Sequence, residues 1–133
     1  MSTVAPRAPV VIEVDAKVWR NPTGLDVADG KELLVSASGC WHDKQYPADA
    51  GGYTPPWLLA LSSPLLRCRN AGWFELVGEI RGKRSVSFPI GLRPRVRVPA
   101  AGRLFLYAND VPGFYCNNRG ALTVTITRSD PRA

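Results

Sequence analysis

Hydrophobic and polar residues alternate along much of the chain with a period of two, the spacing of a β-strand that buries one face. The clearest case is residues 122–127, where Leu122, Val124 and Ile126 share a face. Other stretches with this pattern, rich in β-branched and aromatic residues, are residues 10–16, 32–38, 73–80, 86–90 and 103–108. Helical spacing is nearly absent, so the pattern predicts an all-β protein.

Glycine and proline, 12 of each, fall mostly between these stretches and mark turns. Pro89 interrupts one stretch and predicts an edge strand or a bulge there, because proline cannot donate to a strand ladder. Short strands separated by turns predict a sandwich or a barrel. Of the two, we expect a two-sheet antiparallel β-sandwich, jelly-roll-like in outline. A single domain is expected over residues 1–133, with residues 1–9 as a flexible N-terminal arm.

Two segments do not alternate. Residues 40–57 are rich in aromatic residues, proline and glycine and predict a long loop, a feature that compact domains usually keep for function. Residues 57–66, WLLALSSPLL, are apolar. At this length periodicity does not distinguish a short helix from a buried strand, so both interpretations stand.

Composition narrows the class of protein. Of the 133 residues, 45% are hydrophobic, enough for a core that needs no disulfides. No apolar stretch reaches the roughly 20 residues of a membrane helix, and the N-terminus lacks the pattern of a secretion signal. We therefore predict no membrane span and a cytoplasmic protein as synthesised, with release by a non-classical route as the alternative.

The three cysteines, Cys40, Cys68 and Cys116, are odd in number and widely spaced. They predict free thiols that pack as small hydrophobic side chains. A link between Cys40 and Cys116 is a minor alternative.

The formal net charge is +6, and seven basic residues lie within residues 81–103. Such a cluster is either a polyanion-binding surface or a solvated strand face. Arg95 and Arg97 alternate with Val96 and Val98, which favours the solvated face. The chain shows neither a recognition helix nor an RNA-binding aromatic signature, so no specific nucleic acid is expected as a partner.

Candidate chemistry concentrates in residues 109–118, NDVPGFYCNN, between two predicted strands. Its Val-Pro-Gly centre is a turn signal. Asp110 precedes the turn, and Asn117 and Asn118 follow it, so the loop offers the hard oxygen ligands that calcium takes. With so few carboxylates, calcium here would keep positions open for sugar hydroxyls. The alternative is turn chemistry alone, because Asp and Asn often bond their own backbone in hairpin loops.

The order Asn109-Asp110-Val111-Pro112-Gly113, then Tyr115, Asn117-Asn118 and Gly120, resembles the motif of the PA-I galactophilic lectin family of bacteria. The similarity extends through residues 101–106 and 122–124 and is weaker over residues 14–39 and 75–80. The resemblance implies a galactose-binding-domain-like sandwich that binds carbohydrate in a calcium-dependent way. It also implies a homo-oligomer, either a dimer or a tetramer.

By this resemblance, calcium would be bound by one carboxylate, two side-chain amide oxygens and two backbone carbonyls. The residues are Asp110 (carboxylate), Asn117 and Asn118 (amides), and Phe114 and Asp43 (carbonyls). Four residues would border the sugar: Asp110, Val111, Phe114 and Asn117.

The chain departs from the family at two places near the sugar. Phe114 stands where galactose-binding members carry a threonine, and the family's His-Pro-x-x-Gln segment has no counterpart beyond residues 54–57. The calcium ligands are retained, so calcium binding is implied but galactose preference is not. Tyr53 and Trp57 are candidates for stacking on a sugar ring, with core or rim packing as the alternative.

An enzyme is not predicted. His42 is the only histidine, and no nucleophile signature or close carboxylate pair accompanies it. The competing function is a non-enzymatic interaction module on the same sandwich. In that case calcium would be structural or absent, and polyanions would bind to the basic face.

Overall fold

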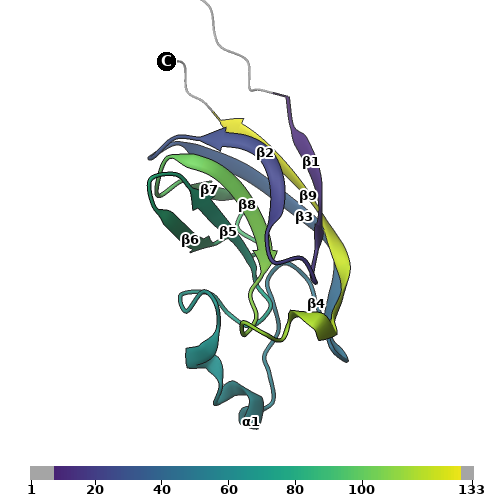
Figure 1. Cartoon of the computed structure of the whole chain (residues 1–133). Coiled ribbons are helices and arrows are strands. Elements are labelled where there is room, and N and C mark those ends of the chain that lie inside the picture. Colours follow the sequence, from purple (N-terminus) through teal and green to yellow (C-terminus); the bar gives the residue numbers. More distant parts are fainter. Residues whose placement is uncertain (1–7, 130–133) are drawn as a thin grey trace, which may run out of the picture.

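The computed structural model describes residues 8–129 (Figure 1). Within this range, the strands form two antiparallel sheets packed face to face. The first sheet has the order β1 (Val10–Asp15), β9 (Asn118–Ser129), β3 (Glu32–Asp43) and β4 (Tyr46–Ala48), with β7 (Arg95–Arg97) also paired to β3. The second sheet has the order β2 (Asn21–Val27), β8 (Gly102–Ala108), β5 (Leu76–Arg81) and β6 (Ser85–Pro89). The predicted all-β sandwich is confirmed. Residues 1–7 of the predicted N-terminal arm lie outside the described residues.

The core lies between the two sheets. Alternate residues of β9 point into it, namely Leu122, Val124 and Ile126, and they meet Leu104 and Leu106 of β8 in one continuous apolar cluster. Each such side chain contributes about 1.5–3 kcal/mol by leaving water. The alternation in sequence is therefore the alternation of burial that the sheets require.

Strand β3 is longer than predicted. It continues to Asp43 because it pairs with β9 over its whole length, and β4 follows after a tight turn. The prediction of a loop beginning at residue 40 was wrong for residues 40–43 and 46–48. Gly39 and Cys40 are exposed and interrupt the hydrophobic pattern, although the backbone ladder passes through them.

Strand β2 was not predicted from hydrophobic alternation, because polar residues occupy some of its buried positions. The Asn21 side chain donates to the Leu106 carbonyl, and the Thr23 hydroxyl donates to the Leu104 carbonyl. These bonds satisfy the buried groups and hold β2 against β8. Pro89 lies in β6, an edge strand of its sheet, as its proline predicted.

Residues 57–66 form a short helix α1 (Trp57–Ala60) and a 3-10 turn (Ser63–Leu65), so the helix alternative is correct and the strand alternative wrong. The segment protrudes from one end of the sandwich (Figure 1). Among residues 8–129, no helix is long and apolar enough to cross a membrane.

All three cysteines are free. Cys68 is buried beside Val77 and Tyr107, as the prediction for a small hydrophobic side chain requires. Cys40 and Cys116 are exposed, so for them the prediction of packed thiols was wrong. Cys40 lies at an exposed position of β3, and Cys116 lies in a short turn before β9. The alternative Cys40–Cys116 link is not formed.

Candidate functional site

The loop of residues 109–118 is held at both ends by buried side chains. Asn109 is fully buried; its Oδ1 accepts from the Cys68 backbone N–H at 2.8 Å, and its Nδ2 donates to the Cys68 and Gly72 carbonyls, each at 2.9 Å. The Tyr115 hydroxyl donates to the Ala108 carbonyl at 2.6 Å. These bonds fix the loop against the end of β8 and the neighbouring segment 68–72, and so position Asp110.

The centre of the loop is the turn that its sequence predicts. The Phe114 backbone N–H donates to the Val111 carbonyl at 3.1 Å, and Gly113 has φ = 94°, a conformation that favours glycine. The Phe114 side chain is 58% exposed. The turn folds the chain back, which brings the second half of the loop toward the first.

The pairing of β3 with β9 brings the first-loop residue to the same place. Asp43, the last residue of β3, lies opposite Asn118, the first residue of β9. One residue further on, the Lys44 backbone N–H donates to the Asn117 carbonyl at 3.2 Å. The register thus places the predicted Asp43 beside the asparagine pair.

Two buried oxygens of this cluster have no hydrogen-bond partner. Asp110 is 2% exposed; its Oδ1 accepts from the Val111 backbone N–H at 2.7 Å, whereas Oδ2 accepts from no group. Asn118 is 1% exposed; its Nδ2 donates to the Ala16 carbonyl at 3.0 Å, whereas Oδ1 has no donor. An unsatisfied buried acceptor costs about 1–3 kcal/mol. A hard cation bound by both oxygens would remove that cost, so the donor set fits calcium.

One further buried side-chain atom in the described range lacks a partner. It is Nε1 of Trp41, whose ring packs edge-on against Phe74 in the core. Nothing in the structure explains it.

The raised pKa of Asp110, like the unpartnered oxygens, indicates a site that a cation would stabilise. Burial raises the pKa of Asp110 to about 6 and the negative charge of Asp43 adds to the rise, whereas the hydrogen bond from the Val111 backbone N–H and the nearby Asn118 side chain lower the pKa. Two carboxylates that repel each other in a buried place are a poor arrangement without a cation. A bound divalent cation would reverse the repulsion.

Tyr53 positions Asp43. Its hydroxyl donates to Asp43 Oδ2 at 2.6 Å, and its ring stacks on that of Tyr46 with centroids 5.4 Å apart. Burial first, and then the bond to Asp43, raise the pKa of Tyr53, so the hydroxyl keeps its proton and remains a donor. The ring is partly buried and packs against the core, as the alternative of core packing for Tyr53 requires.

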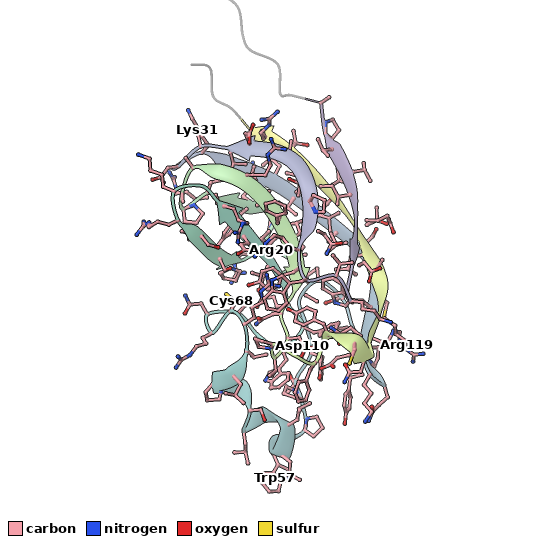
Figure 2. All side chains as sticks on the ribbon, viewed as in Figure 1. Arg20, Lys31, Trp57, Cys68, Asp110 and Arg119 are labelled. Atoms are coloured by element: carbon pink, nitrogen blue, oxygen red, sulfur yellow. The ribbon has the colours of Figure 1, made fainter. Side chains whose placement is uncertain are left out.

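A cavity of about 500 Å³ opens next to these residues. Five predicted site residues line it: Asp43, Asp110, Val111, Phe114 and Asn117. Asn118 is buried and is not among the lining residues, and neither is Tyr53. Trp57 does not line it either; its side chain is 73% exposed at the tip of α1 (Figure 2).

Sequence reasoning missed most of the remaining lining of the cavity. Three polar residues and six apolar ones complete the lining: Lys44, Gln45, Ser62 and the apolar or aromatic Tyr46, Pro56, Leu58, Leu59, Leu65 and Trp73. Most come from the connection between β4 and β5. The signal in the sequence was the apolar run at residues 57–66, whose place beside the loop depends on tertiary structure.

Among the described residues, no group of three or more His, Cys, Asp or Glu side chains is arranged to hold a metal ion. A metal at this site would therefore rely on the carboxylates together with amide and backbone oxygens. Calcium is the common biological cation that accepts such a mixture.

The basic residues at 81–103 are partly neutralised. Four of the seven lie within ion-pair distance of a carboxylate: Arg81 with Glu79, Arg93 with Glu75, Arg95 with Glu32 and Arg103 with Asp26. The pairing reduces the positive field available to a polyanion and agrees with a solvated strand face.

Comparison with known proteins gives matches by structure and none by sequence. No family model matches the chain, and no curated protein matches it by sequence. Among solved structures, it is similar to a chain described as the EclA N-terminal domain, a PllA-like lectin. The TM-score is 0.65 and the identity 25%, over 90% of this chain and 96% of that one. The chain therefore has a lectin-like β-sandwich fold, although this likeness does not assign it to the PA-I galactophilic lectin family.

Proposed function

We propose that the chain is a calcium-dependent carbohydrate-binding domain. The observation that carries the proposal is the pair of buried, unpartnered oxygens, Asp110 Oδ2 and Asn118 Oδ1, beside an open cavity. The lectin named in the structural match supports carbohydrate as the ligand class. The PA-I galactophilic lectin family is the family that the loop motif favours.

The proposed ligands are oxygen atoms of the loop 109–118 and of the last residue of β3. The Asp110 carboxylate and the side-chain oxygens of Asn117 and Asn118 would bind calcium, with the carbonyls of Phe114 and Asp43 completing the protein's share. Calcium, when bound, supplies open coordination positions that sugar hydroxyls occupy in place of water. Tyr53 holds the Asp43 side chain in place through its hydroxyl.

Selectivity would come from the cavity wall. Asp110 and Asn117 line the cavity and offer hydrogen bonds to sugar hydroxyls, and Val111 lies beside them. Phe114 forms a large apolar rim where a small residue would admit more of the ligand. The proposal therefore names carbohydrate as the ligand without galactose as the preferred sugar. Sugar stacking on Trp57 stays a prediction, because Trp57 lies outside the cavity lining.

Assembly is part of the proposal. A single shallow sugar site binds weakly, and linked copies raise the overall affinity by effective concentration. We expect a dimer or a tetramer, which sedimentation velocity of the purified chain measures directly.

Glycan-array binding in calcium and in EDTA tests the function. We expect the wild-type protein to bind a set of glycans in calcium and to lose them in EDTA. Asp110→Asn should lose them in both conditions, whereas the exposed control Asp29→Asn should behave as wild type. Binding that persists in EDTA and falls steeply with added salt would contradict the proposal and favour polyanions on the basic face.

A further inference from the structure

Part of the connection between β4 and β5 carries an exposed apolar surface and no charged side chain. Residues 51–66 contain no Asp, Glu, Lys or Arg. Within them, Trp57 is 73%, Leu58 64%, Leu61 69% and Leu65 62% exposed. Large apolar side chains at this exposure lose favourable burial, so a cluster of them indicates a surface that another phase or molecule covers.

The apolar tip, residues 57–65, lies at one end of the molecule and projects from it. In Figure 1, α1 stands away from the ends of both sheets, and Figure 2 places Trp57 at the far point of that projection. Leu58 and Leu65 also line the cavity at the candidate site. The exposed surface and the proposed sugar site are therefore continuous, and they face the same end of the sandwich.

The size and shape of the apolar tip do not suit a second copy of the chain. Four side chains of this kind expose roughly 500 Å² of apolar surface. A stable protein interface needs about 800 Å² on each partner. A small projection without charged side chains is instead typical of a segment that enters the boundary of a lipid bilayer, with tryptophan at headgroup level.

Exposed basic residues next to the candidate site and after the apolar tip are complementary in charge to an anionic membrane. Lys44 is exposed in the turn between β3 and β4, Arg119 is exposed near the start of β9, and Arg69 is exposed after the projecting segment. The whole chain carries a formal charge of +6. Basic residues near an anionic bilayer each add about 1 kcal/mol of attraction, which supports apolar insertion.

We propose that residues 57–65 insert into the interfacial region of a lipid bilayer and so hold the candidate cavity against the headgroups of membrane glycolipids. Insertion depends on the apolar tip and the basic residues alone. Only the delivery of the cavity to glycolipids rests on the proposed carbohydrate function.

Vesicle flotation in EDTA tests insertion separately from the sugar site. The probe is the full chain with phosphatidylcholine vesicles, with and without a minor share of phosphatidylserine, and with no glycolipid. We expect binding to both, stronger with phosphatidylserine, and a blue shift of tryptophan emission that Trp57→Phe removes. Because calcium and sugar are absent, failure of the proposed function would leave this result unchanged.

Matched variants assign the binding to the apolar tip. Leu61→Ser should lower the vesicle partition coefficient by roughly tenfold, because a polar side chain replaces a leucine that insertion would bury in the bilayer. Leu92→Ser removes a similarly exposed leucine, outside the apolar tip, and should bind as wild type. Both positions are exposed, so both variants should keep the wild-type melting temperature.

Two outcomes would overturn the proposal. One is equal vesicle binding by wild type and Leu61→Ser, which would leave the apolar tip without a role at the membrane. The other is absence of vesicle binding together with a dimer in sedimentation velocity that Leu61→Ser converts to a monomer. That result would identify a second copy of the chain as the occupant.

Discussion

The buried carboxylates of Glu79 and Asp110 differ in how many hydrogen-bond and ion-pair partners the protein gives them. Glu79 accepts hydrogen bonds from Arg20 at 2.7 Å and from the Ser85 hydroxyl at 2.6 Å, and Arg67 lies 3.4 Å away. Asp110 has one oxygen bonded to its neighbouring backbone and the other bonded to nothing. Both side chains are almost completely buried. The number of polar partners therefore distinguishes Glu79, a structural carboxylate, from Asp110, a candidate metal ligand.

The pKa shifts of the two carboxyls differ in sign for the same reason. Burial alone would raise the pKa of Glu79, but the hydrogen bonds from Arg20 and Ser85 and the charges of Arg20 and Arg67 lower it overall. At Asp110 burial dominates, and the pKa rises to about 6. A carboxyl that the protein itself stabilises has a structural role, and one that it leaves destabilised has room for an outside cation.

Arg67 connects the two regions. Its guanidinium lies between the rings of Trp19 and Tyr107, with its centre 3.4 and 3.5 Å from the ring centroids, and its backbone N–H donates to the Asp110 carbonyl at 3.0 Å. The satisfied cluster around Glu79 therefore supports the backbone at the candidate site. Variants in the two regions should differ accordingly.

The largest effect is expected at the satisfied cluster. Glu79→Ala leaves the nearly buried Arg67 without its carboxylate, so the free energy of unfolding should fall by about 3–5 kcal/mol in urea titration. Arg103→Ala breaks an exposed pair with Asp26 and should cost under about 0.5 kcal/mol. Equal costs for the two variants would remove the distinction between buried and exposed pairs here.

The next effect concerns the hydrogen bonds by which Asn109 holds the loop 109–118 against segment 68–72. Asn109→Ala leaves a buried N–H and buried carbonyls of segment 68–72 without partners, which should cost about 2–3 kcal/mol. It should also weaken calcium binding by at least about tenfold, because Asp110 loses its fixed position. Calorimetric titration with calcium, together with urea unfolding, measures both. An unchanged calcium affinity would show that these hydrogen bonds do not position the site.

The pH dependence of the Glu79 cluster has a defined sign. Because the folded-state pKa of Glu79 is below its ordinary value of 4.5, its ionisation adds stability above pH 4.5. That stability is lost as the pH falls through the folded-state pKa. Glu79→Gln should therefore cost about 2 kcal/mol at neutral pH and progressively less in acid. A cost independent of pH would contradict the lowered pKa.

The smallest effect separates two roles of Tyr53. Tyr53→Phe keeps the ring and removes the hydrogen bond to Asp43, so stability should fall by about 1 kcal/mol and calcium affinity roughly threefold. Glycan affinity measured at saturating calcium should stay as in wild type. Loss of glycan affinity at saturating calcium would indicate that the hydroxyl contacts sugar directly.

The sequence predicted those features that local patterns determine. Leu122, Val124 and Ile126 alternate because β9 has one buried face, and Gly113 marks a turn that only a positive φ allows. The placement of Asp43 beside Asn118 depends on a β3–β9 register between distant segments, which no local pattern contains. It was reached only through the family resemblance.

Strand β2, the role of Tyr53 and the cavity wall could not be predicted from hydrophobic alternation. Strand β2 lacks a clear hydrophobic alternation because the polar residues Asn21 and Thr23 occupy inward positions, where they bond to carbonyls of β8. Tyr53 was a candidate for sugar stacking, with core or rim packing as the alternative, and no local pattern indicates the hydrogen bond from its hydroxyl to Asp43. The cavity wall at Leu58 and Leu65 depends on how the apolar tip folds back toward the loop.

Thermal unfolding with and without calcium tests the central claim most directly. With calcium about a hundredfold above its dissociation constant, binding adds about 2.7 kcal/mol to the folded state. The wild-type melting temperature should then rise by roughly 5–10 °C over that in EDTA. Magnesium should shift it far less, because it demands a tighter octahedral shell. Asp110→Asn should melt at one temperature in calcium and EDTA. Identical wild-type melts in millimolar-range calcium and in EDTA would contradict the calcium site.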